Sequence, residues 1–218
     1  MSAGDHHIHY IDLSANSSES NIEEALGKDS YRKLEVQKWE KFHTNEVECS
    51  WKLLAGSDAF FIKFHVKEPV IRSVGKGDQS TVCEDSCVEW FVKPEGSENY
   101  INFEFNPLGA HWIAIGPNRN ERTRFRDSEL PGLRSWGSET EHKDNVPADG
   151  PWEFTAVIPY SIFQLEAMHV LGCTWEANFY KCGNHLPKEH YISWKEIGAP
   201  SPDFHRPEFF SPIIISKK

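Results

Sequence analysis

A stretch of eight residues, DSCVEWFV (residues 85–92), has the alternation of a β-strand with one buried face. Val88, Trp90 and Val92 fall on one side of such a strand, because successive side chains point to opposite faces of a sheet. The other side combines two apolar residues with Glu89, where a solvated face would as readily carry Lys, Thr or Ser. The pattern predicts a strand and raises the question of what surrounds the Glu89 carboxylate.

Short segments of this kind recur along the chain, separated by turn-forming residues, and no sustained helical period is present. They predict an all-β fold, a jelly-roll-like β-sandwich of about nine short strands with one or two short helices. The segments are VECSWKLL from Val47, AFFIKFHV from Ala59, DSCVEWFV, NYINFEFN, AHWIAI, WEFTAVIP, TWEANFYKC, EHYISW and the final FFSPIII.

The remaining segments set the expected domain organisation. Residues 1–30 are predicted to be a polar, irregular N-terminal arm with a weak helical stretch near NIEEAL, and residues 31–218 a single domain. PYSIFQLEAM is predicted to contain a short helix that starts at Pro159 or Ser161. KEPVIRSVGKGDQST and residues 116–150 are expected to be surface loops, because they are rich in charged and turn-forming residues.

A hairpin between DSCVEWFV and NYINFEFN fixes which residues face each other. If the apolar residues share one face, Val92 pairs with Ile101, and this register places Glu89 directly opposite Glu104. Two like charges across a strand pair cost up to about 1 kcal/mol. A sequence tolerates this cost where a cation, an Arg side chain or the hydroxyl groups of a ligand contact the carboxylates. The alternative interpretation is two solvated Glu residues on an exposed face.

Other residues with suitable chemistry accompany this pair. Asn102 and Asn106 fall on the same face of the hairpin, which makes it rich in groups that bind polyols. Trp112 is predicted to point outward, where its flat ring matches the C–H face of a pyranose. Arg206 precedes Pro207, which favours extended backbone. Its guanidinium is expected either to bind a carboxylate such as Glu89 or Glu104, or to tie the last loop to the sandwich.

Bulk properties exclude several classes of protein. The formal net charge of −10 argues against a nucleic-acid partner, since binding to phosphates rests on clustered Lys and Arg. No run approaches the roughly 18 apolar residues of a membrane helix, so no membrane insertion is expected. The N-terminus lacks the features of a signal peptide, which predicts a cytoplasmic location, or an extracellular or periplasmic one if a leader was removed. Five cysteines at unremarkable spacings fit reduced thiols better than a disulfide framework.

Five motifs follow one another from Ser80 to the C-terminus: EDSCVEWFV, YINFEFNPLGA, WEFTAVIPYSIF, WEANFYKC, and ISW with FHRPEFF. In this order and spacing the chain resembles carbohydrate-binding module family 9, less distinctly before residue 80. The resemblance implies a β-sandwich that binds sugars, often attached to enzymes that degrade plant polysaccharides, and hence a role in carbohydrate catabolism. It also implies that calcium is a candidate structural ion, because some family members bind it.

The resemblance implies functional residues position by position. In the family, a sugar ring lies between two Trp side chains, and charged groups contact its hydroxyls. Glu89 corresponds to the family Glu, whereas Glu104 stands where the family has an Arg, which reverses the charge. One family Trp corresponds to Val82 and the other to Phe204, so one aromatic ring remains where the family has two.

The expected function is therefore binding of a saccharide or related polyol without chemical transformation, and no catalytic residue is assigned. The predicted ligand contacts are Glu89, Glu104, Asn102, Asn106, Phe204, Arg206 and Trp112. Two alternatives stay open. One is a glycoside hydrolase that uses Glu89 and Glu104, because Glu residues on adjacent strands have roughly the 5 Å separation of retaining enzymes. The other is a structural or protein-interaction sandwich whose sugar site has decayed.

Two metal sites are also hypotheses. Calcium would bridge Glu89 and Glu104, or lie in the loop from Asp78 to Asp85. The segment CGNHLPKEH offers Cys182 and two histidines, His185 and His190, at a spacing that zinc ligands sometimes show, although no fourth ligand is evident.

Overall fold

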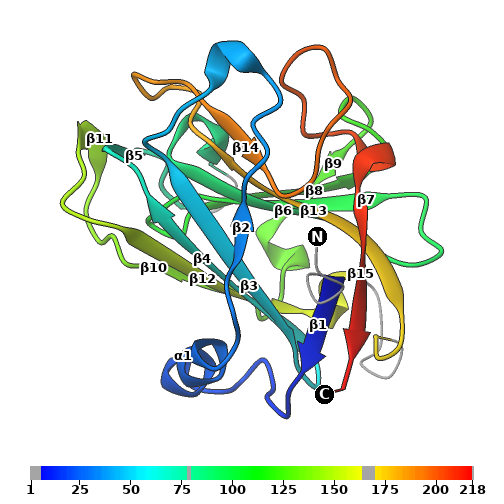
Figure 1. The fold of residues 1–218 in the computed structure, drawn as a ribbon. Coiled ribbons are helices and arrows are strands. Elements are labelled where there is room, and N and C mark those ends of the chain that lie inside the picture. The colour runs from blue at the N-terminus through cyan, green and yellow to red at the C-terminus, as the bar shows by residue number, and fades with distance from the viewer. Residues whose placement is uncertain (1–5, 78–79, 164–169, 218) are drawn as a thin grey trace.

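The structure is a computed structural model that describes residues 6–77, 80–163 and 170–217. Strands dominate this part of the chain and lie in two curved layers (Figure 1). In chain order the strands are β1 (His7–Tyr10), β2 (Arg32–Leu34), β3 (Glu48–Ala55), β4 (Ala59–Lys67), β5 (Val70–Ser73), β6 (Cys87–Lys93), β7 (Tyr100–Phe105), β8 (His111–Gly116), β9 (Thr123–Arg124), β10 (Arg134–Gly137), β11 (Lys143–Pro147), β12 (Trp152–Pro159), β13 (Thr174–Cys182), β14 (Tyr191–Ser193) and β15 (Ser211–Ser216).

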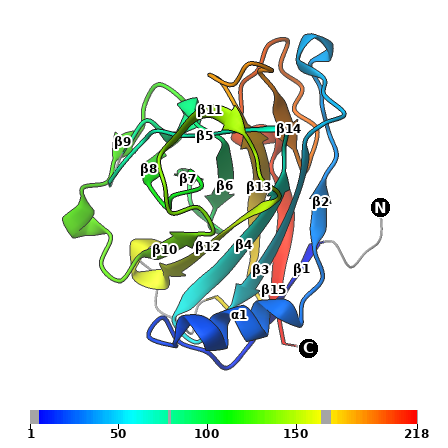
Figure 2. The ribbon, with the colours of Figure 1, turned by 90° about the vertical axis from the view of Figure 1, so that its left-hand side faces the viewer.

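Most of these strands belong to one curled sheet with the order β10-β12-β4-β3-β1-β15-β13-β6-β7-β8-β9. β2 pairs with β3, β14 pairs with β13, and β5 forms a separate pair with β11. One layer contains β10, β12, β4 and β3, and the other contains β13, β6, β7 and β8 (Figures 1 and 2). The layers join along β1 and β15, where β1 pairs in parallel with both β15 and β3. The predicted all-β sandwich is confirmed.

The main hydrophobic core fills the space between the two layers. Trp90 of β6 stacks on Phe103 of β7 with ring centroids 5.4 Å apart. Trp51 of β3 stacks on Phe179 of β13 at 3.5 Å, so this contact joins the two layers directly. The apolar face of β6 predicted from its alternation lies in this core, and its residues are fully buried.

The opposite face of β13, β6 and β7 is covered as well. A second apolar cluster lies there, in which Phe91, Tyr100 and Tyr180 from the three strands pack with Trp39 and Phe204 from connecting segments. Both faces of these strands are therefore buried. On the face that carries Glu89, the large apolar residues contact loops that fold back over the sheet.

Helical structure is limited to one α-helix and short 3₁₀ turns in the described part of the chain. The helix α1 (Glu19–Gly27) confirms the prediction near NIEEAL, and its buried Ile22 and Leu26 pack against the outer side of β3 and β4. None of these helices has the length and apolar character needed to cross a bilayer. The 3₁₀ turns include η2 (Glu40–Phe42), η3 (Val82–Glu84), η4 (Asp127–Glu129), η5 (Tyr160–Phe163) and η7 (Pro207–Phe209).

Three segments differ from their sequence predictions. The expected irregular N-terminal arm contains β1, whose four residues HIHY are too short to show a period. The two predicted loops contain β5 and, within residues 116–150, the strands β9, β10 and β11. These strands are short. β10 and β9 pair with the longer β12 and β8, whereas β5 and β11 pair with each other. The predicted helix in PYSIFQLEAM begins as η5, and residues 164–169 lie outside the described residues.

Candidate functional site

A row of side chains crosses four neighbouring strands on the loop-covered face of the sheet. Trp112 of β8 lies directly opposite Glu104 of β7, Glu104 opposite Glu89 of β6, and Glu89 opposite Tyr180 of β13. The register predicted for the hairpin, with Val92 paired to Ile101, is therefore confirmed. Because side chains in register lie on the same face, pairing alone brings one Trp and two carboxyl groups together.

A cavity of about 250 Å³ lies over this row. Glu89, Glu104 and Trp112 line it from the sheet. The connecting loops contribute Arg119, Arg122, Asp203, Phe204 and His205, and the start of β14 contributes Tyr191. The volume lies just below the roughly 300–1,000 Å³ that drug-sized ligands occupy, so the cavity suits a ligand of one or two small rings.

The two carboxyl groups are in an unusual environment. Glu89 is 3% exposed and Glu104 is 6% exposed, so the alternative of two solvated Glu residues is wrong. Burial raises the pKa of Glu89 to about 7, although thiol donors from Cys182 and Cys87 counteract part of this effect. Burial and the neighbouring Glu89 charge raise the pKa of Glu104 well above its usual value. Near neutral pH the pair therefore retains a proton, which lowers the repulsion between the opposed groups.

Hydrogen bonds hold these carboxyl groups in place. The Cys182 thiol donates to Oε1 of Glu89 at 3.1 Å. Asn102 donates from Nδ2 to Oε1 of Glu104 at 3.0 Å, and its Oδ1 accepts from Nη1 of Arg122 at 2.9 Å. Since Asn102 is fully buried with both ends of its amide engaged, it orients Glu104 and couples it to the Arg122 guanidinium.

Two cationic side chains and a carboxylate lie across the cavity from the sheet. Arg122 also donates from Nε to the carbonyl of Arg119, and Nη1 of Arg119 lies 3.4 Å from Oδ1 of Asp203. His205 also lines the cavity, and Nδ1 of its ring lies 3.0 Å from the Tyr100 hydroxyl. Burial and the two nearby guanidinium groups lower the pKa of His205 to about 2, so this ring is neutral at ordinary pH. The cavity thus combines hydrogen-bond donors and acceptors with aromatic side chains.

Comparison with known proteins identifies the kind of domain that carries this cavity. The family model described as carbohydrate-binding family 9 matches residues 21–215 of the chain. The chain belongs to carbohydrate-binding family 9. The crystal structure of a candidate carbohydrate-binding protein from Bacteroides uniformis is similar, with a TM-score of 0.86 and 30% identity over 96% of this chain and 97% of that one.

More distant family 9 structures share the fold. A family 9 module from Caldicellulosiruptor kristjanssonii in complex with glucose has a TM-score of 0.62 and 12% identity, over 97% of this chain and 95% of that one. The complex with cellotriose gives a TM-score of 0.62 and 11% identity, over 97% of this chain and 94% of the other. No protein of curated function matches the chain in sequence.

Trp112 and the two positions that correspond to the family Trp residues lie at different depths. Val82, at one expected Trp position, is fully buried in η3. Phe204, at the other, is 7% exposed and stacks on Tyr180 with ring centroids 4.2 Å apart, so most of its surface is covered. Trp112 is only half-buried, and the Arg124 guanidinium lies 5.1 Å from its ring centroid. Trp112 is therefore the most accessible of the three positions.

Arg206 lies apart from the cavity, and the expectation that it binds Glu89 or Glu104 is wrong. Its Nη2 lies 2.6 Å from a carboxylate oxygen of Glu208, and its guanidinium packs over Phe209. A partner two residues away in sequence satisfies this Arg at lower entropic cost than a distant one. Arg122 is the guanidinium that the structure couples to Glu104.

Asn106 is also placed outside the cavity. Its Nδ2 donates to Oδ2 of Asp85 and to the Gly75 carbonyl, both at 2.8 Å. Its Oδ1 accepts from the backbone N–H groups of Leu108 and Ala110. With its amide fully engaged and fully buried, Asn106 holds the β7–β8 turn against the neighbouring loop.

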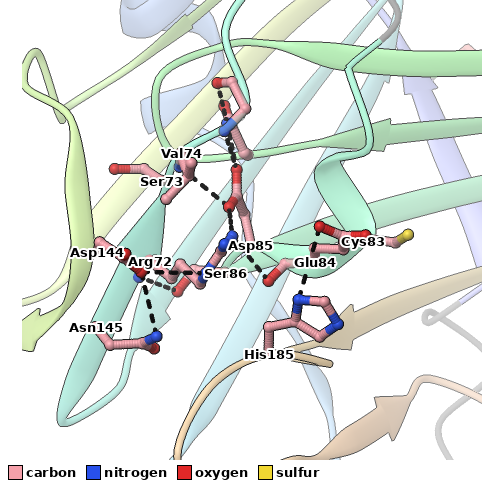
Figure 3. A network of polar contacts seen from close by, with 12 residues as sticks. Arg72, Ser73, Val74, Cys83, Glu84, Asp85, Ser86, Asp144, Asn145 and His185 are labelled. Carbon is pink, nitrogen blue, oxygen red and sulfur yellow. Dashed lines mark hydrogen bonds and ion pairs between the residues drawn. The ribbon is translucent and has the colours of Figure 1, made fainter.

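The Asp-Ser pair of the family motif belongs to the same polar network (Figure 3). Asp85 accepts from Nη1 of Arg72 at 2.5 Å and from the N–H groups of Val74 and Gly75 at 3.0 and 2.9 Å. Ser86 accepts from the Arg72 backbone N–H at 3.1 Å. These donors, together with the Asn106 amide, saturate the Asp85 carboxylate and supply its countercharge. Asp85 therefore does not fit a calcium ligand, and Asp78, the other end of that hypothetical site, lies outside the described residues.

The three residues of the zinc hypothesis are in separate surroundings. The Cys182 thiol faces Glu89, as described above. The buried His190 ring lies 3.1 Å from Nζ of Lys181, and His185 lies 3.6 Å from Glu84 near the surface. Within the described residues, Cys182 groups instead with Cys87 and Glu89.

Several cavity residues were not singled out from the sequence. Arg119, Arg122 and Asp203 lie in polar loops without periodicity, so nothing local distinguishes them from other surface charges. Cys182 carried a usable signal, because TWEANFYKC predicts a strand with Cys182 and Tyr180 on one face. The pairing partner of that strand was the missing information.

Proposed function

We propose that this family 9 domain binds a short saccharide or a chain end in the cavity over β6, β7 and β8, without transforming it. The single observation that carries the proposal is the row Trp112, Glu104, Glu89 at the floor of a small cavity in a chain of this family. The glucose and cellotriose bound by two structural neighbours support this ligand class.

Each group has a role that follows from its chemistry. Trp112 offers an apolar face on which the C–H groups of a pyranose stack. Glu104, oriented by Asn102, and Asp203 accept hydrogen bonds from sugar hydroxyls, while Arg119 and Arg122 donate them. Hydroxyl donors favour the ionised form of a carboxyl group, so a bound sugar supplies the contacts that the opposed Glu pair lacks in the free protein.

The direct test is a glycan array, followed by calorimetry with glucose and cellotriose. We expect binding confined to a few related saccharides, and Trp112→Ala to weaken it at least about tenfold, or 1.4 kcal/mol. Trp136→Ala is the matched control, because Trp136 is also half-buried but lies on β10 in the other layer. An array without binding to any glycan would overturn the proposal and leave a sandwich that serves structure or protein interaction.

The hydrolase alternative has a separate test. The Glu89 and Glu104 carboxyls lie side by side at the floor, whereas the acid and nucleophile of a glycosidase flank the scissile bond. We therefore expect no release of chromophore from aryl glycosides. Turnover that disappears in Glu89→Gln, with the fold intact, would favour the enzyme instead.

A further inference from the structure

Two cysteines face each other below the cavity. Cys87 begins β6 and Cys182 ends β13, and the antiparallel register pairs them directly. Glu89 lies two residues after Cys87 and therefore points to the same face. Exposure is 0% for Cys87, 2% for Cys182 and 3% for Glu89, and both thiols are free.

The three side chains converge on one point. Their sulfur and oxygen atoms all lie within 4.8 Å of one another. Ligand atoms around a tetrahedral zinc lie about 3.6–3.8 Å apart, given Zn–S bonds of about 2.3 Å and Zn–O bonds of about 2.1 Å. The Cys182–Glu89 separation of 3.1 Å is already slightly shorter. Side-chain shifts of about 1 Å or less therefore complete three corners of a tetrahedron.

From this geometry we propose that Cys87, Glu89 and Cys182 bind a zinc ion at the floor of the cavity. Two sulfur ligands select zinc or a similarly thiophilic metal, whereas calcium takes oxygen ligands alone. Glu89 and Cys182 also line the cavity, so the fourth coordination position faces it and takes water or another small donor. This site requires neither the His residues of CGNHLPKEH nor a calcium bridge between Glu89 and Glu104.

Zinc binding at this site needs no reactant other than the ion. Coordination replaces the thiol protons of Cys87 and Cys182 and any proton on Glu89, and these protons pass to the buffer. The ion with two thiolates and one carboxylate carries a net charge of −1. Arg122 and Lys181 are the cations whose fields reach Glu89, and they offset this charge.

Cobalt and zinc binding test the proposal on the full chain, reduced and freed of metal. Titration with Zn²⁺ against a chromophoric chelator should give one ion per chain, and Co²⁺ should produce the near-ultraviolet band of thiolate-to-cobalt charge transfer. Cys87→Ala and Cys182→Ala should each weaken the zinc affinity by at least about 100-fold. Cys49→Ala is the matched control, since Cys49 is a buried thiol on β3 outside this cluster. Circular dichroism verifies that each variant is folded.

Three results would overturn the proposed zinc site. Binding that persists in both cluster variants, or cobalt binding without the thiolate band, would assign the metal to other residues such as the N-terminal His6 and His7. Absence of stoichiometric binding in the reduced wild type is the third. The titration contains no sugar, and saccharide binding is measured in chelator, so failure of either function leaves the other intact.

Discussion

Glu89 on β6 and Glu104 on β7 lie directly opposite each other, and both carboxyl groups are buried beneath the loops that close the cavity. Such a pair lowers the stability of an empty protein, because each ionised group is both desolvated and repelled by the other. Asn102 and the Cys182 thiol contact the pair, and neither supplies a positive charge in direct contact. In the proposed function, the hydroxyl groups of a bound saccharide would offset this cost.

Glu104→Gln should stabilise the free protein increasingly as the pH rises. The folded-state pKa of Glu104 is raised, so its favourable contribution is present below the unfolded-state value of 4.5 and is lost at higher pH. We expect nearly equal unfolding free energies at pH 4.5, and a gain of about 1–3 kcal/mol for the variant at pH 8. Denaturant titration at both pH values measures the difference, with Glu98→Gln on the surface as the control. A variant no more stable than wild type at pH 8 would show that the opposed pair costs no stability.

Arg122→Ala should weaken saccharide binding, and it should lower stability by about 1–3 kcal/mol because it leaves the buried Oδ1 of Asn102 without its donor. Arg122 is half-buried at the rim and reaches Glu104 through Asn102. Loss of a hydrogen bond to a charged group costs about 1.5–3 kcal/mol, or roughly 10–100-fold in the dissociation constant. Calorimetry should show this loss, whereas Arg126→Ala, at an exposed Arg paired with Glu129, should leave the affinity unchanged. Equal effects of the two substitutions would count against a role for Arg122 in the site.

Asp85→Ala should destabilise the fold without a contribution from calcium. The fully buried Asp85 carboxylate receives the Arg72 guanidinium, backbone N–H groups and the Asn106 amide, and its removal leaves these donors unsatisfied. We expect a loss of about 3–5 kcal/mol in unfolding free energy. Asp144→Ala removes the more exposed partner of the same Arg and should cost less than about 1 kcal/mol. Added calcium should leave the wild-type melting temperature unchanged, and a rise would show a calcium site.

The contrast between β6 and the loops explains how far the sequence could predict this site. Strand periodicity and apolar matching determine the register of the β6–β7 hairpin, so the opposed Glu pair could be derived before the structure was known. The same reasoning could not show that loops bury the pair, because their position depends on contacts such as Phe204 on Tyr180 that are distant in sequence. Arg122 and Arg206 illustrate the limit, since both are loop arginines and only the fold decides which one lines the cavity with Glu104.

The family motif predicts the fold better than it predicts the ligand contacts. Asp85 and Ser86 tie the start of β6 to Arg72, and Asn106 secures the following turn. Such buried polar networks specify one arrangement of neighbouring strands when every member is satisfied. A motif that is recognisable in sequence therefore marks how the strands are held. Of the groups proposed to bind hydroxyls, Glu104 lies within the motifs, whereas Arg119, Arg122 and Asp203 lie in loops outside them.

His190→Gln should reduce the loss of stability of this protein in acid. The buried His190 ring lies 3.1 Å from Nζ of Lys181, and burial together with that charge lowers its pKa to about 3. His190 binds a proton near pH 6.5 in the unfolded chain but only near pH 3 in the folded chain. The contribution of neutral His190 to folding stability is therefore present above pH 6.5 and is lost as the pH falls toward 3. Between pH 6.5 and 5, wild type should lose about 2 kcal/mol more than the variant. His142→Gln, at an exposed position, is the control. Parallel stability profiles of wild type and His190→Gln would show that His190 accepts its proton without unfolding.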